Sequence, residues 1–313
     1  MKYSRRLAVI LLSGALAVFV AESRTVAAEK PISLDPVTVT LPSGTLKYLD
    51  TGGKGVPLLL LHPVNIRLWQ YQIPAFAKAG YRVIAVDSRN HAPDGPREGF
   101  AGNEGQVRLD ELVTQLNLPK FHIIGTDMNG GLALQYAMAH PDKIRSVVMS
   151  GTLGNLRDPG PVPPHTDLAA LESSLRPAPF NELPLSARYL SPSYRAGNPD
   201  GAKRWLELED EGNAGFPQPQ LPPGGTPNVS GGPSGAPWPN QLTVEMLEAW
   251  TLPTMMITGD ADNYTPPAMM RIFVSHLKHG NGAGAVIPES AHATYWENPD
   301  AYNRAVLAFI RKH

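Results

Sequence analysis

The sequence predicts an α/β fold in which helices cover both faces of a mostly parallel central sheet. Three observations predict it. Segments patterned like strands alternate with helical segments along most of the chain. Residues 57–61 are apolar at every position, as in a strand buried on both faces. Residues 121–124 end in a glycine-rich turn, and a helical pattern follows at once. With 313 residues and 42% hydrophobic content, the chain can bury one large core that carries an insertion.

The elements of this core follow in order along the chain. A hairpin opens the fold, with strands at 37–41 and 46–49 around Pro42-Ser43-Gly44. After the buried strand at 57–61, the pattern predicts a helix at 69–79, a strand at 82–86, a helix at 104–116, a strand at 121–124, a helix at 132–140, strands at 146–150, 254–258 and 283–287, and a closing helix at 299–310.

The first 28 residues are predicted to be a signal peptide. Three basic residues among the first six precede an apolar run at 7–21, and small residues before position 29 suit cleavage after Ala28. The apolar run is shorter than the roughly 20 residues that a membrane span needs, which favours export over anchoring. We therefore expect an exported protein, periplasmic or secreted.

Charge and composition exclude several partners. The first 28 residues carry four basic residues and one acidic residue, so their removal shifts the formal net charge from −1 to −4. No basic cluster remains to bind nucleic acid or an anionic membrane, and the expected partner is a small-molecule substrate. The chain has no cysteine, which excludes thiol nucleophiles and zinc–thiolate sites. No cofactor and no metal are predicted, and the oligomeric state is left open.

The alternation breaks between residues 152 and 245, so the core is predicted to consist of residues 29–151 and 246–313. Helical fragments occur within this insertion at 168–175 and 201–209. The segment 212–240 is crowded with proline and glycine and cannot bury much by itself. The segment is therefore either an ordered part of the insertion or a linker-like excursion from it.

Three chemical motifs fall at the ends of predicted strands. Gly125-Thr126-Asp127-Met128-Asn129 places one reactive side chain, Asp127, at a sharp strand-to-helix turn. Asp262 follows the strand at 254–258, and His292 follows the strand at 283–287. Asp127 alone would more often be a helix N-cap. Together the motifs resemble the α/β-hydrolase fold with its nucleophile, acid and histidine in that chain order, and specifically its aspartate-nucleophile branch. The resemblance implies that residues 152–245, inserted after the sixth strand, form a lid.

This resemblance implies a covalent mechanism. Asp127 would attack an electrophilic carbon and form an ester, because a carboxylate needs no base to become nucleophilic. His292, oriented by Asp262, would then activate the water that hydrolyses the ester. The backbone N–H groups of Met128 and Val64 would bind the oxyanion of that second step.

Two branches with an aspartate nucleophile compete. Epoxide hydrolases use lid tyrosines to stabilise an alkoxide, for which Tyr189 and Tyr194 are the candidates. Dehalogenases need donors for a leaving halide, which Asn65 and Trp205 could supply, but Met128 stands where haloalkane dehalogenases have tryptophan. We therefore favour an epoxide hydrolase-like enzyme, with a haloalkane or haloacid dehalogenase as the alternative.

Two further alternatives stay open. The chain could be an esterase or lactonase in which aspartate occupies the serine position, or a non-catalytic binding protein of this fold. The presence of both Asp262 and His292 argues against a pure binder, which needs no oriented base. Asn129 replaces a family glycine beside the elbow, which predicts a wider turn.

Overall fold

The computed structural model describes residues 32–87, 89, 91, 104–154, 156, 180, 182–216 and 242–313. Residues 33–313 form one unit. The predicted signal peptide, the helical fragment at 168–175 and most of the proline- and glycine-rich segment at 212–240 lie outside the described residues.

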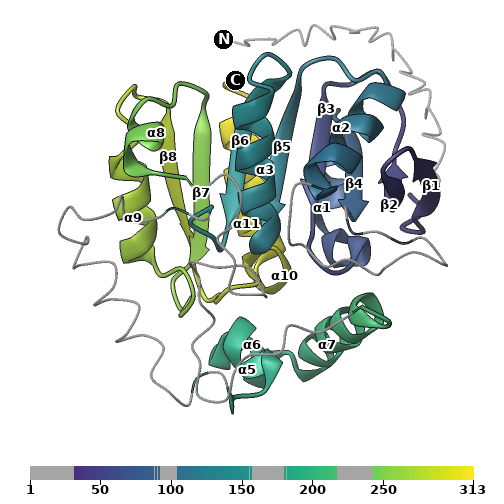
Figure 1. The fold of residues 1–313 in the computed structure, drawn as a ribbon. Helices are drawn as coiled ribbons and strands as arrows, with labels where there is room; N and C mark the ends of the chain where they lie inside the picture. The colour runs from purple at the N-terminus through teal and green to yellow at the C-terminus, as the bar shows by residue number, and fades with distance from the viewer. Residues whose placement is uncertain are drawn as a thin grey trace, which may run out of the picture. The chain divides into compact units, whose positions relative to one another are not determined.

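The described residues form an eight-stranded sheet in the order β1-β2-β4-β3-β5-β6-β7-β8 (Figure 1). The strands are β1 (Val37–Leu41), β2 (Gly44–Asp50), β3 (Pro57–Leu61), β4 (Arg82–Asp87), β5 (Phe121–Thr126), β6 (Ile144–Ser150), β7 (Thr254–Gly259) and β8 (Gly282–Ile287). β1 pairs with β2, and β2 with β4, in antiparallel fashion, whereas all later pairs are parallel. The predicted mostly parallel sheet is confirmed.

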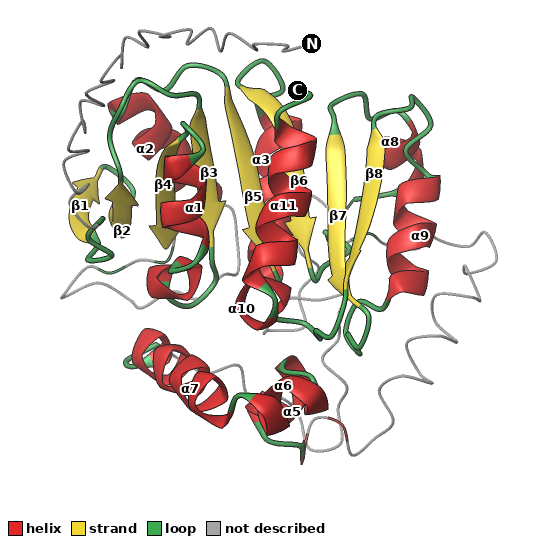
Figure 2. Cartoon of the chain, turned by 180° about the vertical axis from the view of Figure 1, so that it is seen from behind, coloured by secondary structure: helices red, strands yellow, loops and turns green. Residues whose placement is uncertain are grey.

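Helices cover both faces of this sheet (Figures 1 and 2). One face carries α1 (Gln72–Lys78) and α11 (Pro299–Ile310), and the other carries α2 (Glu104–Gln115), α3 (Met128–Ala139) and α9 (Pro267–Ser275). In β3, Leu58 and Leu60 join the first core, while Leu59 and Leu61 join the second. The apolar run therefore lacks polar alternation because both of its faces are buried.

Helices also lie between β6 and β7 in the chain. These are α5 (Leu185–Tyr189), α6 (Pro192–Gly197), α7 (Pro199–Asn213) and α8 (Val244–Glu248). Helices α5, α6 and α7 lie beyond the carboxyl-terminal edge of the parallel strands (Figure 2). α6 and α7 each begin with a proline after a side-chain cap, Ser191 and Asn198 respectively. No helix in the described ranges has both the length and the apolar character that crossing a membrane requires.

Two predicted helices differ from the observed ones, and several observed helices were not predicted. The helix predicted at 69–79 divides into a 3₁₀ helix, η1 (Ile66–Trp69), and α1, whose first turn contains Pro74. The helix predicted from residue 132 begins at Met128. The prediction began too late because Gly130 and Gly131, in the first turn, have low helix propensity. The helices α5, α6, α8 and α9 and the short α10 (Thr294–Glu297) were not predicted.

Candidate active site

Asp127 occupies a strained backbone position between β5 and α3. β5 ends at Thr126 and α3 begins at Met128, so Asp127 alone makes the turn, with φ 51° and ψ −131°. Few L-residues adopt positive φ, and such strain is concentrated at functional sites. A Cβ on Gly125 would lie 2.1 Å from the Asn129 carbonyl oxygen, so only glycine allows this close approach.

Asn129 does not hold α3 away from the sheet. Its side chain is buried, and its carbonyl oxygen lies directly against Gly125. The next residue, Gly130, packs against Thr152, whose Cγ2 would be 2.1 Å from an added Cβ. The turn predicted to widen at Asn129 therefore stays tight, because the glycine that the close packing needs lies one position later.

His292 lies between two carboxylates in the loop after β8. Its Nδ1 is 3.2 Å from each carboxylate oxygen of Asp262, and its Nε2 is 3.9 Å from Oδ1 of Asp127. His292 and Asp262 are buried, whereas the Asp127 side chain keeps 28% exposure. The structure thus brings the three predicted residues together. The neighbouring Asp260 instead accepts the backbone N–H groups of Glu289 and Ser290.

The positive charge of His292 and the negative charges of Asp262 and Asp127 stabilise one another. Burial alone would lower the pKa of His292, but the charges of Asp262 and Asp127 raise it to about 10. Burial alone would raise the pKa of Asp127, but the His292 imidazole and the Tyr189 hydroxyl hold it below its usual range. At neutral pH Asp127 is therefore an ionised carboxylate that faces an imidazolium. If Asp127 became a neutral ester, the pKa of His292 would fall and the imidazole could act as a base.

Tyr189, at the end of α5, holds the other oxygen of Asp127. Its hydroxyl donates to Oδ2 of Asp127 at 3.2 Å. Burial and the charge of Asp127 raise the pKa of Tyr189 well above its usual value, so the phenol keeps its proton. The Tyr189 carbonyl accepts the backbone N–H groups of His292 and Ala293, at 3.0 and 3.1 Å. These two bonds fix α5 to the histidine loop.

Trp205 packs beside this tyrosine. The two rings are tilted, with centroids 5.6 Å apart, and Trp205 is buried in α7. Its indole Nε1 has no hydrogen-bond partner among the residues that the structure describes. Trp205 is thus placed next to Tyr189, the residue that holds Asp127.

Three of the predicted residues are turned to other partners. The Val64 N–H, predicted for the oxyanion hole, donates to Nδ1 of His62 at 3.1 Å, because that buried nitrogen needs a partner. Asn65 caps η1 and donates to the Leu208 carbonyl at 3.0 Å, which ties α7 to the loop after β3. The Tyr194 hydroxyl accepts from Asn198 Nδ2 at 3.2 Å rather than facing Asp127.

Met128, the other predicted oxyanion donor, is the first residue of α3. The first N–H groups of a helix have no partner within it, and the helix dipole favours negative charge there. The position of Met128 is therefore compatible with the predicted role, which stays a prediction.

Two residues near the centre were not predicted. Tyr264 packs against His292 and Tyr189, with ring centroids 4.8 and 5.1 Å away. Glu209, on α7, is buried, and it raises the pKa of Tyr189 through its charge. No sequence signal separates Glu209 from its acidic neighbours in the run 207–211, which is typical of a solvated helix face.

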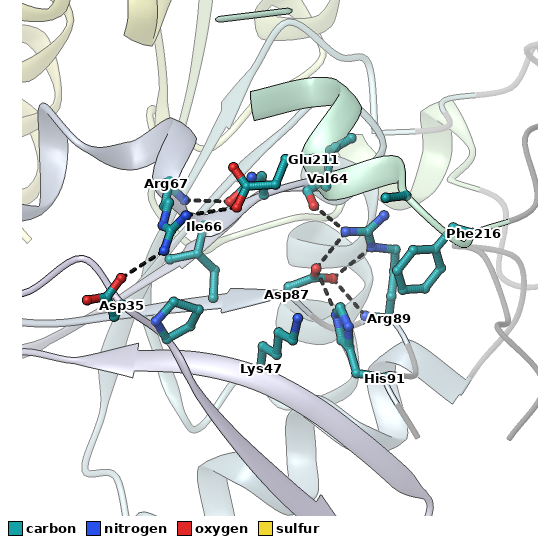
Figure 3. A pocket seen from close by; sticks show the side chains of 14 residues that line it. Asp35, Lys47, Val64, Ile66, Arg67, Asp87, Arg89, His91, Glu211 and Phe216 are labelled. Carbon is teal, nitrogen blue, oxygen red and sulfur yellow. Dashed lines mark hydrogen bonds and ion pairs between the residues drawn. The ribbon is translucent and has the colours of Figure 1, made fainter. Parts of the chain in front are cut away.

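A separate polar pocket of about 310 Å³ lies between the loop after β3, the end of β4 and the end of α7 (Figure 3). Neither Asp127 nor His292 lines it. Arg89 joins Asp87 to the Val64 carbonyl in this wall, and Phe216 stacks on its guanidinium (Figure 3). These contacts of Arg89 therefore brace the outer side of the Val64 loop. Among the described residues no group of three or more His, Cys, Asp or Glu could hold a metal ion.

Known proteins are similar to this chain over part or most of its length. It is 32% identical over 119 residues to bifunctional epoxide hydrolase 2 of Rattus norvegicus, a match that covers 36% of this chain and 22% of that protein. It is 28% identical over 275 residues to BpoC of Mycobacterium tuberculosis, whose name places it among non-heme bromoperoxidases, covering 83% of this chain and 96% of BpoC. The chain thus spans about a fifth of the rat protein.

Solved structures share the fold. A bromoperoxidase from Bacillus anthracis superposes with a TM-score of 0.63 at 23% identity, covering 88% of this chain and all of that one. An esterase from Thermogutta terrifontis gives a TM-score of 0.64 at 20% identity, covering 89% and 98%. The family model described as the alpha/beta hydrolase fold matches residues 56–299. The chain therefore belongs to the α/β-hydrolase family and is a hydrolase of that fold.

Proposed function

We propose that this hydrolase opens small organic epoxides through an ester on Asp127. One observation carries the proposal: a carboxylate at the strained apex is held between the Tyr189 hydroxyl and His292, at 3.2 and 3.9 Å. A serine nucleophile needs an adjacent base to lose its proton, whereas ionised Asp127 can attack saturated carbon directly.

The proposed reaction has two steps. In the first, an oxygen of Asp127 bonds to an epoxide carbon and the carbon–oxygen bond of the ring breaks, leaving its electron pair on oxygen. Tyr189, which keeps its proton, donates a hydrogen bond to that oxygen. The ring oxygen then takes up a proton, and His292, beside the now neutral ester, loses its proton to solvent. In the second step, neutral His292 takes a proton from the water that attacks the ester carbonyl of Asp127 and passes it to the departing oxygen, which releases a diol. The proton left on Asp127 returns to His292. The N–H of Met128 stabilises the oxyanion.

Helices α5, α6 and α7 act in this proposal as a lid that supplies Tyr189. Their place beyond the carboxyl edge of the sheet supports this role, as does the anchoring of the Tyr189 carbonyl by His292 and Ala293. A lid that excludes water would strengthen the electrostatic interactions around Asp127.

A dehalogenase is the second candidate. The unused indole N–H of Trp205 beside Tyr189 is a donor suited to a leaving halide. A fluoroacetate dehalogenase from a Burkholderia species is 32% identical over 108 residues, although the match covers 31% of this chain.

A substrate panel tests the proposal. Purified protein is given a terminal epoxide, a haloalkane, a haloacid and a p-nitrophenyl ester, and diol, halide and nitrophenolate are measured. We expect diol from the epoxide and little halide or nitrophenolate. Rapid halide release without diol would favour the dehalogenase, and rapid ester cleavage that survives Asp127→Asn would overturn the aspartate mechanism.

We further propose that the protein is exported. The charged, apolar and small-residue order of residues 1–28 supports this. Expression of the full chain in a bacterium, followed by mass spectrometry of the periplasmic and culture fractions, should yield a mature protein beginning at Glu29. An uncleaved chain retained in the cytosol would contradict export.

A further inference from the structure

We propose that Glu209 is an additional catalytic residue: the carboxylic acid that gives a proton to the oxygen set free when Asp127 opens an epoxide. This inference rests on the proposed function and deepens it.

The placement of Glu209 on α7 supports this role. It lies four residues after Trp205, so the two side chains share one face of the helix, and Trp205 packs on Tyr189. Glu209 is 6% exposed. The α7 backbone is fixed close to the sheet, because Asn65 binds the Leu208 carbonyl and a Cβ on Gly212 would lie 2.4 Å from the Val64 carbonyl oxygen. The carboxyl group is thus held in place rather than free to swing away.

The surroundings of Glu209 keep it protonated. Burial and the negative charge of Asp127 raise its pKa to about 8. Arg89, two residues after β4, and His292, in the loop after β8, oppose that rise, while Asp210 on the same helix as Glu209 adds to it. At neutral pH the group is therefore mainly a neutral acid with an O–H to donate.

The Glu209 carboxyl is also unengaged. Within the part of the chain that the structure describes, it makes no hydrogen bond, and its oxygens keep some solvent-accessible surface. A neutral acid that makes no hydrogen bond, on the same helix face as the tryptophan that packs on Tyr189, is available to a substrate. Most buried carboxyl groups are instead engaged, as Glu297 is by the N–H groups of Ser191 and Ala291.

The reaction also needs a second donor. The predicted partner of Tyr189, Tyr194, faces Asn198 instead. An alkoxide is strongly basic, and a carboxylic acid can transfer a whole proton to it, whereas a phenol with a raised pKa mainly donates a hydrogen bond.

The protons balance over one cycle. When the ring oxygen takes the proton of Glu209, the products are a hydroxyalkyl ester on Asp127 and a Glu209 carboxylate. Since Asp127 is now neutral, His292 loses its proton, which returns through solvent to Glu209. Neutral His292 then accepts the proton of the attacking water and passes it to the departing alkoxide. Asp127 is left as the acid, and its proton goes to His292, which restores the starting state.

The test isolates the first step. In a His292→Ala parent, where the ester should persist, intact-mass spectrometry follows adduct formation on Asp127 from a terminal epoxide and from an alkyl bromide. Bromide leaves as a weak base and needs no proton. Glu209→Gln should slow the epoxide adduct about 10²-fold, the usual contribution of a general acid, and leave the bromide adduct within about twofold. Glu211 lies on the same helix as Glu209 and forms an exposed ion pair with Arg67. Glu211→Gln is therefore the matched control and should change neither rate.

Each outcome decides the matter. Equal slowing with both electrophiles would show a structural role and overturn the proposal, as would an unchanged epoxide rate. Absence of any adduct in the parent with either electrophile would overturn the proposed function itself, which is a distinguishable result. In the parent, the epoxide rate should also fall as the pH rises above about 8, because Glu209 ionises there and the loss of the His292 charge moves its pKa further up, while Glu209→Gln should show no such fall. A fall that persists in the variant would contradict the assignment to Glu209.

Discussion

The loops after β3 and β8 each carry a buried histidine, and their environments drive the two in opposite directions. Burial lowers the pKa of His62 to about 3. The charges of Asp262 and Asp127 raise that of His292 to about 10, although His292 is also buried. Both rings lie at the carboxyl-terminal edge of the same sheet, so the difference comes from their partners.

The partners of His62 require the neutral ring. Its Nδ1 accepts the N–H of Val64, so the ring proton sits on Nε2 and is donated to the Tyr295 hydroxyl at 2.8 Å. His292 instead meets a carboxylate at each nitrogen, which favours the charged form. Burial alone thus keeps His62 neutral, whereas the two flanking carboxylates keep His292 charged although it is equally buried.

Asp127→Asn should have the largest effect on this contrast. The amide keeps the shape but loses the nucleophile, so epoxide turnover should fall by at least about 10⁴-fold and no adduct should form. The pKa of His292 should also fall, because one of its two carboxylates is gone. Product assays and histidine NMR titration measure both effects. Peptide mass must show that residue 127 remains asparagine, and near-normal turnover by such protein would contradict the assignment.

His292→Ala should separate the two steps. Asp127 can still attack, but water has no base, so ester hydrolysis should slow by about 10²–10⁴-fold and the adduct should accumulate. Intact-mass spectrometry during turnover measures it. The matched variant in the other loop, His62→Gln, should accumulate no adduct. Accumulation in both variants would mean that the two histidines do not differ as described.

Tyr189→Phe should have a smaller effect. It removes the hydrogen bond that Tyr189 donates to Asp127 and, during ring opening, to the epoxide oxygen. The rate of adduct formation should therefore fall by an amount equivalent to about 1–3 kcal/mol. Stopped-flow or quenched-flow measurement with an epoxide gives this rate. Tyr194→Phe is the control, because its hydroxyl faces Asn198, and its rate should change by less than about twofold. A larger effect at Tyr194 would restore it as a ring-opening donor.

The smallest effect concerns stability at mildly acidic pH. The pKa of His62 is lower in the folded than in the unfolded protein. The contribution of His62 to the free energy of unfolding is therefore present above about pH 6.5 and is lost as the pH falls toward 3. Between pH 6.5 and 5.5 that loss is about 1 kcal/mol of unfolding free energy. His62→Gln should reduce the pH dependence over this window by that amount in urea unfolding. For His292 the sign is reversed, since its contribution is present below about pH 6.5 and is lost as the pH rises through about 10. An unchanged slope in His62→Gln would contradict the neutral state of His62.

Residue patterns predicted the sheet and the meeting of three distant residues, because strand ends in a parallel sheet converge on one edge. Asp127 and Asp262 each follow a buried strand, and His292 follows the partly exposed strand β8. The three motifs together, in the chain order of the α/β-hydrolase fold, were needed for the prediction. The orientation of individual groups in loops could not be predicted. Whether the Val64 N–H faces a substrate or His62 depends on a contact within the folded loop.

Contacts between the inserted helices and the core could not be predicted from the sequence either. Tyr189 and Tyr194 are five residues apart in similar sequence surroundings, yet only Tyr189 reaches Asp127, because α5 ends where the His292 loop binds its carbonyl. Glu209 lies in an acidic run that resembles a solvated face, and only the packing of α7 buries it.

A single turnover in ¹⁸O-labelled water shows whether an ester forms on Asp127. With enzyme in excess over a terminal epoxide, we expect the label to enter the Asp127 carboxylate, so the peptide that contains it gains about 2 Da, the spacing of the two oxygen isotopes, while the diol carries none. Label in the diol after that single turnover, with none in Asp127, would show direct attack by water and rule out the ester.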